Sequence, residues 1–145
     1  MTVPTVEDLR IALEAGDANS SEQLLVRNPK LANSREKTPP PLHLMVWCNR
    51  PEMVELLLDH GADIESRDQD NDTRPVRYAI VYGRKEMIRL LIARGADLGV
   101  LDGKDTSALD VALKGASGGF EEFEELPSRQ EYREVAVLLR ELGAE

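Results

Sequence analysis

Leucine-rich segments that end in glycine or asparagine recur along this chain. The clearest copies are residues 55–61 and 89–95, and residues 22–28 and 137–143 are weaker copies. Their last residues are Asn28, Gly61, Gly95 and Gly143, at steps of 33, 34 and 48 positions. Glycine enters the left-handed backbone conformation that ends many helices, and asparagine is the next best residue there. The pattern predicts helices that end at regular intervals.

Each leucine-rich segment is preceded by another apolar segment. These lie at residues 8–13, 41–46, 75–80 and 108–113. Each has the length of a short helix, and Gly16, Asn49 and Gly83 follow the first three. Thr5 has the spacing of an N-terminal capping residue, and Pro51 stands where a first helical residue belongs. The predicted unit is helix, tight turn, helix and loop. It occurs four times, with helix pairs at about 5–28, 38–61, 73–95 and 106–143.

These segments resemble the ankyrin repeat family. Residues 41–44 (Pro-Leu-His-Leu) and 107–112 match the family signature that opens a first helix, and Gly-Ala-Asp at 61–63 and 95–97 matches the end of a second helix. The resemblance implies an all-α solenoid of four helix-turn-helix repeats in one domain, residues 1–145. Two departures stand out. Pro40 replaces the signature threonine, so its hydrogen bond to histidine is lost, and Arg74 is an extra residue at which repeat 3 should bulge.

The longest step exceeds the repeat length by 15 residues, which predicts an insertion at about 116–130 in repeat 4. Phe120, Phe123 and Leu126 recur there every three residues, as on one edge of a short helical turn. We expect the phenylalanines to dock on repeat 4 and the glutamates to face outward beside the binding groove. A disordered acidic loop is the alternative.

Terminal repeats of a solenoid need polar outer faces. Arg10 and Gln23 replace apolar or signature residues in the first repeat, and Arg140 does so in the last. We therefore expect the stack to be capped at both ends within this chain, and the chain to be a monomer.

The net charge of −9 and the pI of about 4.8 narrow the choice of partner. An acidic surface repels nucleic acid and anionic lipid, so we expect neither nucleic acid nor a membrane as partner. A protein with a basic patch is favoured, although the charge can also serve solubility alone. One cysteine, no leader-like N-terminus and no long apolar stretch fit a cytoplasmic protein.

Catalytic and metal chemistry are poorly supported. His43 occupies the signature position, for which the family implies a structural hydrogen-bonding role. His60 lies beside a helix C-terminus, and neither histidine belongs to a metal-like cluster. Cys48 is five residues from His43, which is poor spacing for a facing pair on one helix. With no phosphate loop or nucleophile motif either, we expect no enzyme activity, no cofactor and no metal.

The resemblance implies a concave binding face made of loop tips and the inner faces of the first helices. Within it we expect the strongest contributions from Trp47, Tyr82 and Arg74, since aromatic residues and arginine dominate binding hot spots. The alternative for Trp47 is packing against its own neighbours. The predicted partner-binding residues are Glu14, Trp47, Cys48, Val81, Tyr82 and Lys114 at helix ends, Glu36, Lys37, Arg67, Gln69, Asp70, Asp72, Arg74, Leu101 and Lys104 at loop tips, and Glu121, Glu122 and Glu124 in the insertion.

Two functions follow. The first is a non-catalytic protein–protein interaction module that binds a partner through its concave face. The second is a dedicated inhibitor or immunity-type protein that blocks a basic enzyme, such as a nuclease toxin or a kinase. Residues 73–76 (Thr-Arg-Pro-Val) resemble the ankyrin inhibitors of cell-cycle kinases.

Overall fold

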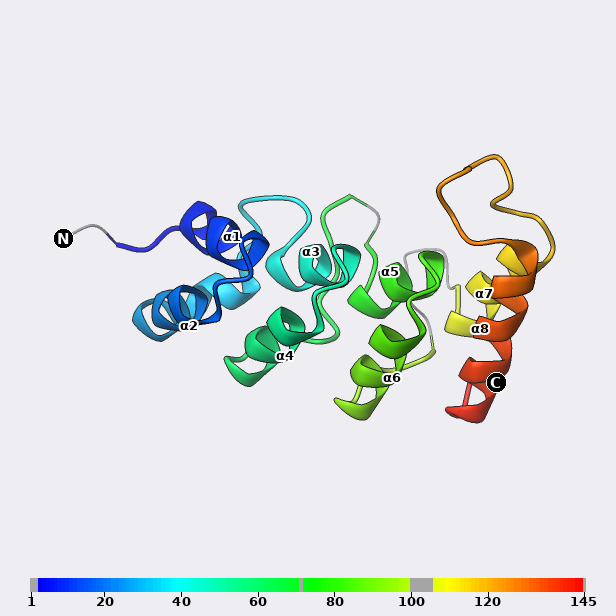
Figure 1. Cartoon of the computed structure of the whole chain (residues 1–145). Helices are drawn as coiled ribbons and strands as arrows, with labels where there is room; N and C mark the ends of the chain where they lie inside the picture. The colour runs from blue at the N-terminus through cyan, green and yellow to red at the C-terminus, as the bar shows by residue number, and fades with distance from the viewer. Residues whose placement is uncertain (1–2, 71, 100–105, 145) are drawn as a thin grey trace.

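The chain folds into a row of helix pairs (Figure 1). The computed structural model describes residues 3–70, 72–99 and 106–144. In these ranges the elements are α1 (Val6–Glu14), α2 (Ala18–Arg27), the 3-10 helix η1 (Pro29–Asn33), α3 (Pro41–Trp47), α4 (Pro51–Asp59), α5 (Pro75–Val81), α6 (Lys85–Ala93), α7 (Ala108–Ala116) and α8 (Arg129–Glu141). The predicted all-α architecture of four helix-turn-helix units is confirmed.

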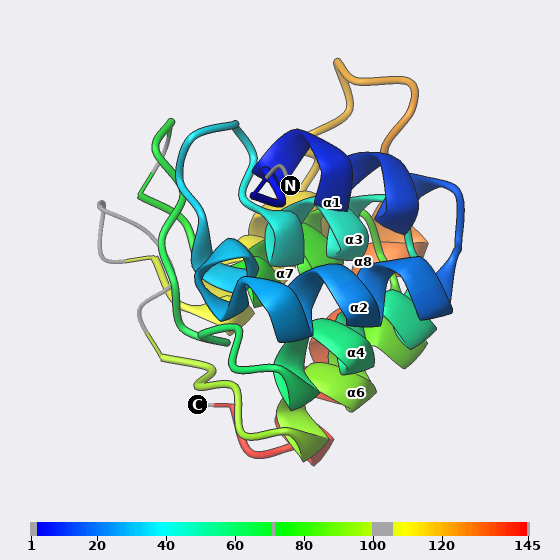
Figure 2. The same ribbon diagram turned by 90° about the vertical axis from the view of Figure 1, so that its left-hand side faces the viewer.

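The first helices of the pairs form one row and the second helices form another (Figures 1 and 2). Along the first row α1 packs on α3, α3 on α5 and α5 on α7. Within each pair the two helices pack on each other, most extensively α7 and α8. Loops connect the pairs, and those that precede α3 and α5 project away from the helices (Figure 2).

Local sequence signals set the helix boundaries. Thr5 caps α1 in a capping box with Asp8, and Pro51 is the first residue of α4, both as predicted. Gly16, Asn49 and Gly83 have φ values of 71°, 55° and 65° and turn the chain within each pair. The left-handed conformation expected at the end of the second helices is present at Gly61, Gly95 and Gly143. It is wrong for Asn28, whose φ is −143° because the chain passes directly into η1 there.

One continuous apolar core runs through the stack, built from leucine, isoleucine, valine, methionine and alanine of every helix. At its ends Gln23 and Arg140 are exposed, as expected of capping positions. The same expectation for Arg10 is wrong. Its guanidinium donates a hydrogen bond to the carbonyl oxygen of Pro39 at 2.7 Å, so this side chain joins repeat 1 to repeat 2.

Candidate partner-binding surface

The C-terminal ends of the first helices lie along one row and carry most of the predicted helix-end residues. Glu14, Trp47 and Val81 end α1, α3 and α5, whereas Lys114 precedes the end of α7 because that helix continues to Ala116. Trp47 therefore corresponds to Val81, and Tyr82 corresponds to Cys48. Tyr82 and Trp47 therefore belong to adjacent repeats but do not occupy equivalent positions.

Trp47 and Tyr82 line the same pocket, which has a volume of about 320 Å³. The indole of Trp47 is 45% exposed and Tyr82 is half-buried. The remaining wall residues come from the loop tips and from α5: Pro39, Asp70, Thr73, Arg77, Tyr78 and Val81. Aromatic groups with this degree of exposure in a pocket can bury large area against a partner.

A second pocket of about 290 Å³ adjoins the first. It shares Arg77, Val81 and Tyr82 with the first pocket, and its far wall is formed by the connection between α7 and α8: Phe120, Phe123, Glu125 and Leu126. We call the two pockets together, from Trp47 to Phe123, the aromatic groove. The groove thus extends from the end of α3 across the end of α5 to the α7–α8 connection.

The two phenylalanines of the α7–α8 connection behave differently. Phe120 is buried, with its ring centroid 5.5 Å from that of Tyr132 and 5.1 Å from Nζ of Lys114. Phe123 is 52% exposed, so the expectation that both rings dock on repeat 4 is wrong for this one. The connection forms turns and no regular helix over residues 117–128. Two of its turns are closed by hydrogen bonds from Phe123 N to Phe120 O and from Leu126 N to Phe123 O, both at 3.0 Å, so the predicted three-residue spacing recurs in these turns.

The glutamates of this connection face outward. Glu121, Glu122 and Glu124 are exposed. The guanidinium of Arg129 holds Glu121 in an ion pair and lowers the pKa of its carboxyl group.

The loop tips before α3 and α5 are joined by hydrogen bonds, and the predicted site residues Gln69 and Asp70 take part in them. Gln69 Nε2 donates to the carbonyl oxygen of Arg35 at 2.5 Å, and Asp70 accepts a hydrogen bond from the Thr38 hydroxyl at 3.0 Å. Glu36 and Lys37 are exposed beside them. Leu101 and Lys104 lie outside the described residues.

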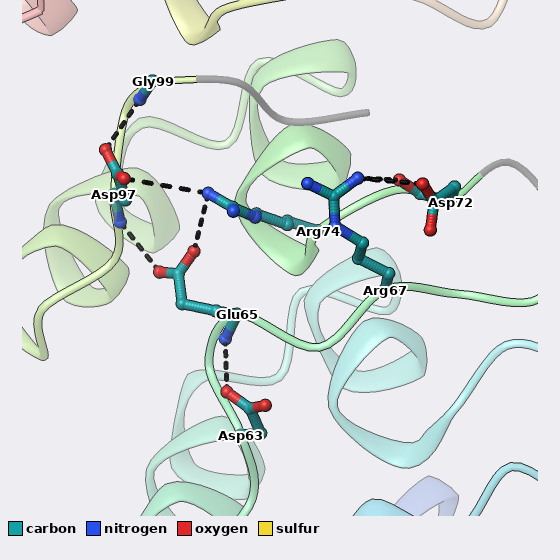
Figure 3. Close-up of polar contacts among 7 residues, drawn as sticks. All are labelled: Asp63, Glu65, Arg67, Asp72, Arg74, Asp97 and Gly99. Atoms are coloured by element: carbon teal, nitrogen blue, oxygen red, sulfur yellow. Dashed lines mark hydrogen bonds and ion pairs between the residues drawn. The ribbon is translucent and has the colours of Figure 1, made fainter. Parts of the chain in front are cut away.

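Arg74 is not among the residues that line the aromatic groove. Its guanidinium is 3.1 Å from a carboxylate oxygen of Glu65 and 3.8 Å from one of Asp97, and the side chain is only 19% exposed (Figure 3). Arg67 instead pairs with Asp72 of its own loop at 2.9 Å (Figure 3). Arg74 therefore links loops of successive repeats, whereas Trp47 and Tyr82 line the first pocket.

His43 takes a structural position. The imidazole is fully buried, its Nε2 lies 2.7 Å from the carbonyl oxygen of Thr73, and its Nδ1 has no hydrogen-bond partner. The missing partner follows from Pro40, which has no hydroxyl to offer. Burial lowers the pKa of His43. The hydrogen bond to Thr73 and the charge of Asp68 raise this pKa by smaller amounts, and the charge of Arg35 lowers it slightly further.

Cys48 is exposed at the end of α3, and its pKa is raised by partial burial and by the charge of Glu14. A nucleophilic thiol needs the opposite shift. Among residues 3–70, 72–99 and 106–144 no cluster of histidine, cysteine, aspartate and glutamate could hold a metal ion. In the same ranges no helix has the length and apolar character needed to cross a bilayer.

Sequence reasoning missed Arg77 and Tyr132. Arg77 lies between the two pockets, at the position that corresponds to His43 in the previous repeat. Tyr132 is buried on α8 and donates a hydrogen bond to the carbonyl oxygen of Val81 at 2.5 Å. Its helical spacing to Val135 and Ala136 was a signal that it belongs to the core.

A family model and the most similar curated proteins that we compared both point to ankyrin repeats. A family model described as ankyrin repeats (3 copies) matches residues 9–102, which ends before α7. The chain is 50% identical over 38 residues to ankyrin repeat and SOCS box protein 6 of Pongo abelii and of Mus musculus, and 47% identical to that of Homo sapiens. Each match covers 26% of this chain and only 9% of the relative, so the chain matches less than a tenth of those proteins.

Proposed function

The chain belongs to the ankyrin repeat family, and from this premise we propose that it is a non-catalytic module that binds a partner protein through the face formed by its first helices and loop tips. Ankyrin repeats generally mediate protein–protein interaction and are typically not enzymes. The observation that carries the proposal for this chain is the aromatic groove, because Trp47 and Tyr82 meet there in one pocket.

Exposure and charge support the same face. Trp47 is the single tryptophan of the chain, and nearly half of its surface remains open to solvent. The net charge of −9 favours a partner with a basic patch, because opposite charges accelerate encounter. We propose that the chain acts as a monomer, with the groove as its single main contact surface.

The experiment is capture of partners by the full chain, identification by mass spectrometry, and measurement of affinity with purified components. Trp47→Ala should weaken binding by at least about 2 kcal/mol, since it truncates a central aromatic anchor. Val26→Ala is the matched control, because Val26 is a 64%-exposed apolar residue on the second-helix row. Equal affinity of the Trp47→Ala variant and the unmodified chain would refute the groove as the binding site.

The acidic charge also favours a second candidate, an inhibitor that blocks a basic enzyme. Such an inhibitor should bind one partner tightly, with an association rate that falls steeply as salt rises. An adaptor should bind more weakly and to several partners. Association kinetics at low and high salt distinguish the two.

A further inference from the structure

The α7–α8 connection gives the aromatic groove a second wall that the regular repeats do not supply. Phe123 and Leu126 face the same pocket as Val81 and Tyr82 of α5. Tyr132 fixes the base of this wall, because its hydroxyl binds the carbonyl oxygen of Val81 and its ring packs on Phe120. The wall is therefore attached to repeat 3 by buried contacts, while the ring of Phe123 remains 52% exposed beside the pocket.

The size of the groove indicates what could fill it. Volumes of about 320 and 290 Å³ lie at the lower end of the roughly 300–1,000 Å³ usual for ligand pockets. Each pocket has the scale of one large side chain with its flanking backbone. Two such pockets side by side, with an exposed aromatic ring at either end, suit a chain segment with two apolar side chains.

Charge around the groove favours cations in that segment. Asp70 lines the first pocket and Glu125 the second, and both are exposed. Glu122 and Glu124 are exposed on the same connection as Glu125. Nearby cations are already engaged within the fold: Arg129 with Glu121, Lys114 with the Phe120 ring, and Arg77 by its own contacts.

We propose that the aromatic groove binds an extended segment of the partner that carries two large apolar side chains flanked by lysine or arginine, an inference that rests on the proposed function. One apolar side chain packs against Trp47 and Tyr82. The other packs against Phe123 and Leu126. The flanking cations face Asp70 at one end and Glu122, Glu124 and Glu125 at the other, so the α7–α8 connection selects the charge of the partner.

The probe is a library of random short peptides displayed on phage and selected on the full chain. Selected peptides should combine spaced aromatic or large aliphatic residues with lysine or arginine. Their binding should shift the fluorescence of Trp47 to shorter wavelength, because the single tryptophan of the chain loses its contact with water. Affinity should fall as salt rises.

Variants separate the two walls of the groove. Phe123→Ala should weaken peptide binding about tenfold or more, and Trp47→Ala about thirtyfold. The triple variant Glu122→Gln, Glu124→Gln and Glu125→Gln should weaken binding about tenfold at low salt and much less at high salt. Glu86→Gln is the matched control, because Glu86 is exposed on the second-helix row. Helical circular dichroism should stay unchanged throughout.

The outcomes distinguish this inference from the proposed function. If Trp47→Ala abolishes binding while the Phe123 and glutamate variants bind normally, the proposed function stands and the role of the connection is refuted. If no variant changes affinity, both fail. Selection of acidic peptides, of peptides without large apolar residues, or of no peptides at all overturns the inference.

Discussion

The imidazole of His43 lies with its Nε2 atom 2.7 Å from the carbonyl oxygen of Thr73, which precedes the next helix pair. Because a carbonyl only accepts, Nε2 carries the proton and Nδ1 is a bare, buried acceptor. Arg10 makes the corresponding bond one repeat earlier, to the carbonyl oxygen of Pro39 at 2.7 Å. The stack is thus held at successive junctions by a side chain of one first helix that binds the loop before the next.

Stability should fall as the solution becomes more acidic than the ordinary histidine pKa of 6.5. The pKa of His43 is lowered in the folded chain, so the unfolded chain binds a proton first. The stabilisation is complete above pH 6.5 and is lost as the pH falls toward the lowered pKa, by at most about 1.4 kcal/mol per pH unit. Urea unfolding between pH 7 and 5 measures the slope.

The charged and titratable groups around His43 are Asp68, Arg35 and Tyr78, whose ring is 5.2 Å away by centroid. His43→Gln should remove the slope and keep a donor toward Thr73. His60→Gln is the control, because His60 is the other histidine and pairs at the surface with Glu22. A slope that survives His43→Gln and vanishes with His60→Gln would contradict the assignment.

The repeated helix pairs could be predicted from local sequence signals. The contacts between repeats could not. The turns at Gly16, Asn49 and Gly83 follow from residue type, since few other residues accept a positive φ. The bond of Arg10 to Pro39 spans 29 positions and depends on how two repeats stack. The left-handed turn predicted at Asn28 was also wrong, because η1 begins directly after this residue.

The residues of the candidate site likewise include some that could be predicted from the sequence and some that could not. Trp47 and Tyr82 could be predicted to lie close together because Trp47 ends α3 and Tyr82 directly follows α5, the equivalent helix of the next repeat. Arg74 could not be assigned from sequence, since only the folded loops place Glu65 and Asp97 around its guanidinium. Spacing alone gave Phe120 and Phe123 one role, whereas packing against Tyr132 buries only the first.

Gly115→Ala should destabilise the chain, although alanine usually improves a helix by about 1 kcal/mol over glycine. A Cβ at position 115 would lie 2.3 Å from Cγ of the buried Tyr132 ring. Such overpacking costs about 1–3 kcal/mol and outweighs the gain in propensity. Chemical denaturation measures the change. In a Tyr132→Ala background the same substitution should become neutral or stabilising, and an unchanged cost there would rule out the steric explanation.

Arg74→Ala should lower stability by about 1 kcal/mol, and its effect on partner affinity should be indirect. The substitution removes the only arginine shown between Glu65 and Asp97 and leaves two carboxylates near one another (Figure 3). This loss of stability is modest because Asp97 is 67% exposed and solvent screens its charge. Arg67→Ala is the matched control, since that ion pair with Asp72 lies within one exposed loop. Equal stability of the two variants would show that the contact between repeats contributes nothing.

Gly83→Ala should cost more stability than Gly16→Ala, although both residues follow a first helix with similar positive φ, 65° and 71°. Alanine in this conformation costs about 1–2 kcal/mol at either site. At position 83 the added Cβ would also lie 2.8 Å from Cγ of Pro127, in the α7–α8 connection. At position 16 its nearest neighbour is the flexible guanidinium of Arg50 at 3.1 Å. The difference in unfolding free energy between the two variants therefore measures how firmly the connection is held against α5.

Pro127→Ala removes the clashing Cγ and leaves Cβ, which would lie 3.5 Å from the new methyl group, an ordinary contact distance. In that background Gly83→Ala and Gly16→Ala should cost the same. In the chain that keeps Pro127, we expect Gly83→Ala to lower the unfolding free energy by at least about 1 kcal/mol more than Gly16→Ala does, as at other overpacked sites. Urea unfolding of the four variants checks this. Equal costs in the unmodified chain would mean that the connection yields freely, and the second wall of the aromatic groove would then be too loosely held to select a partner.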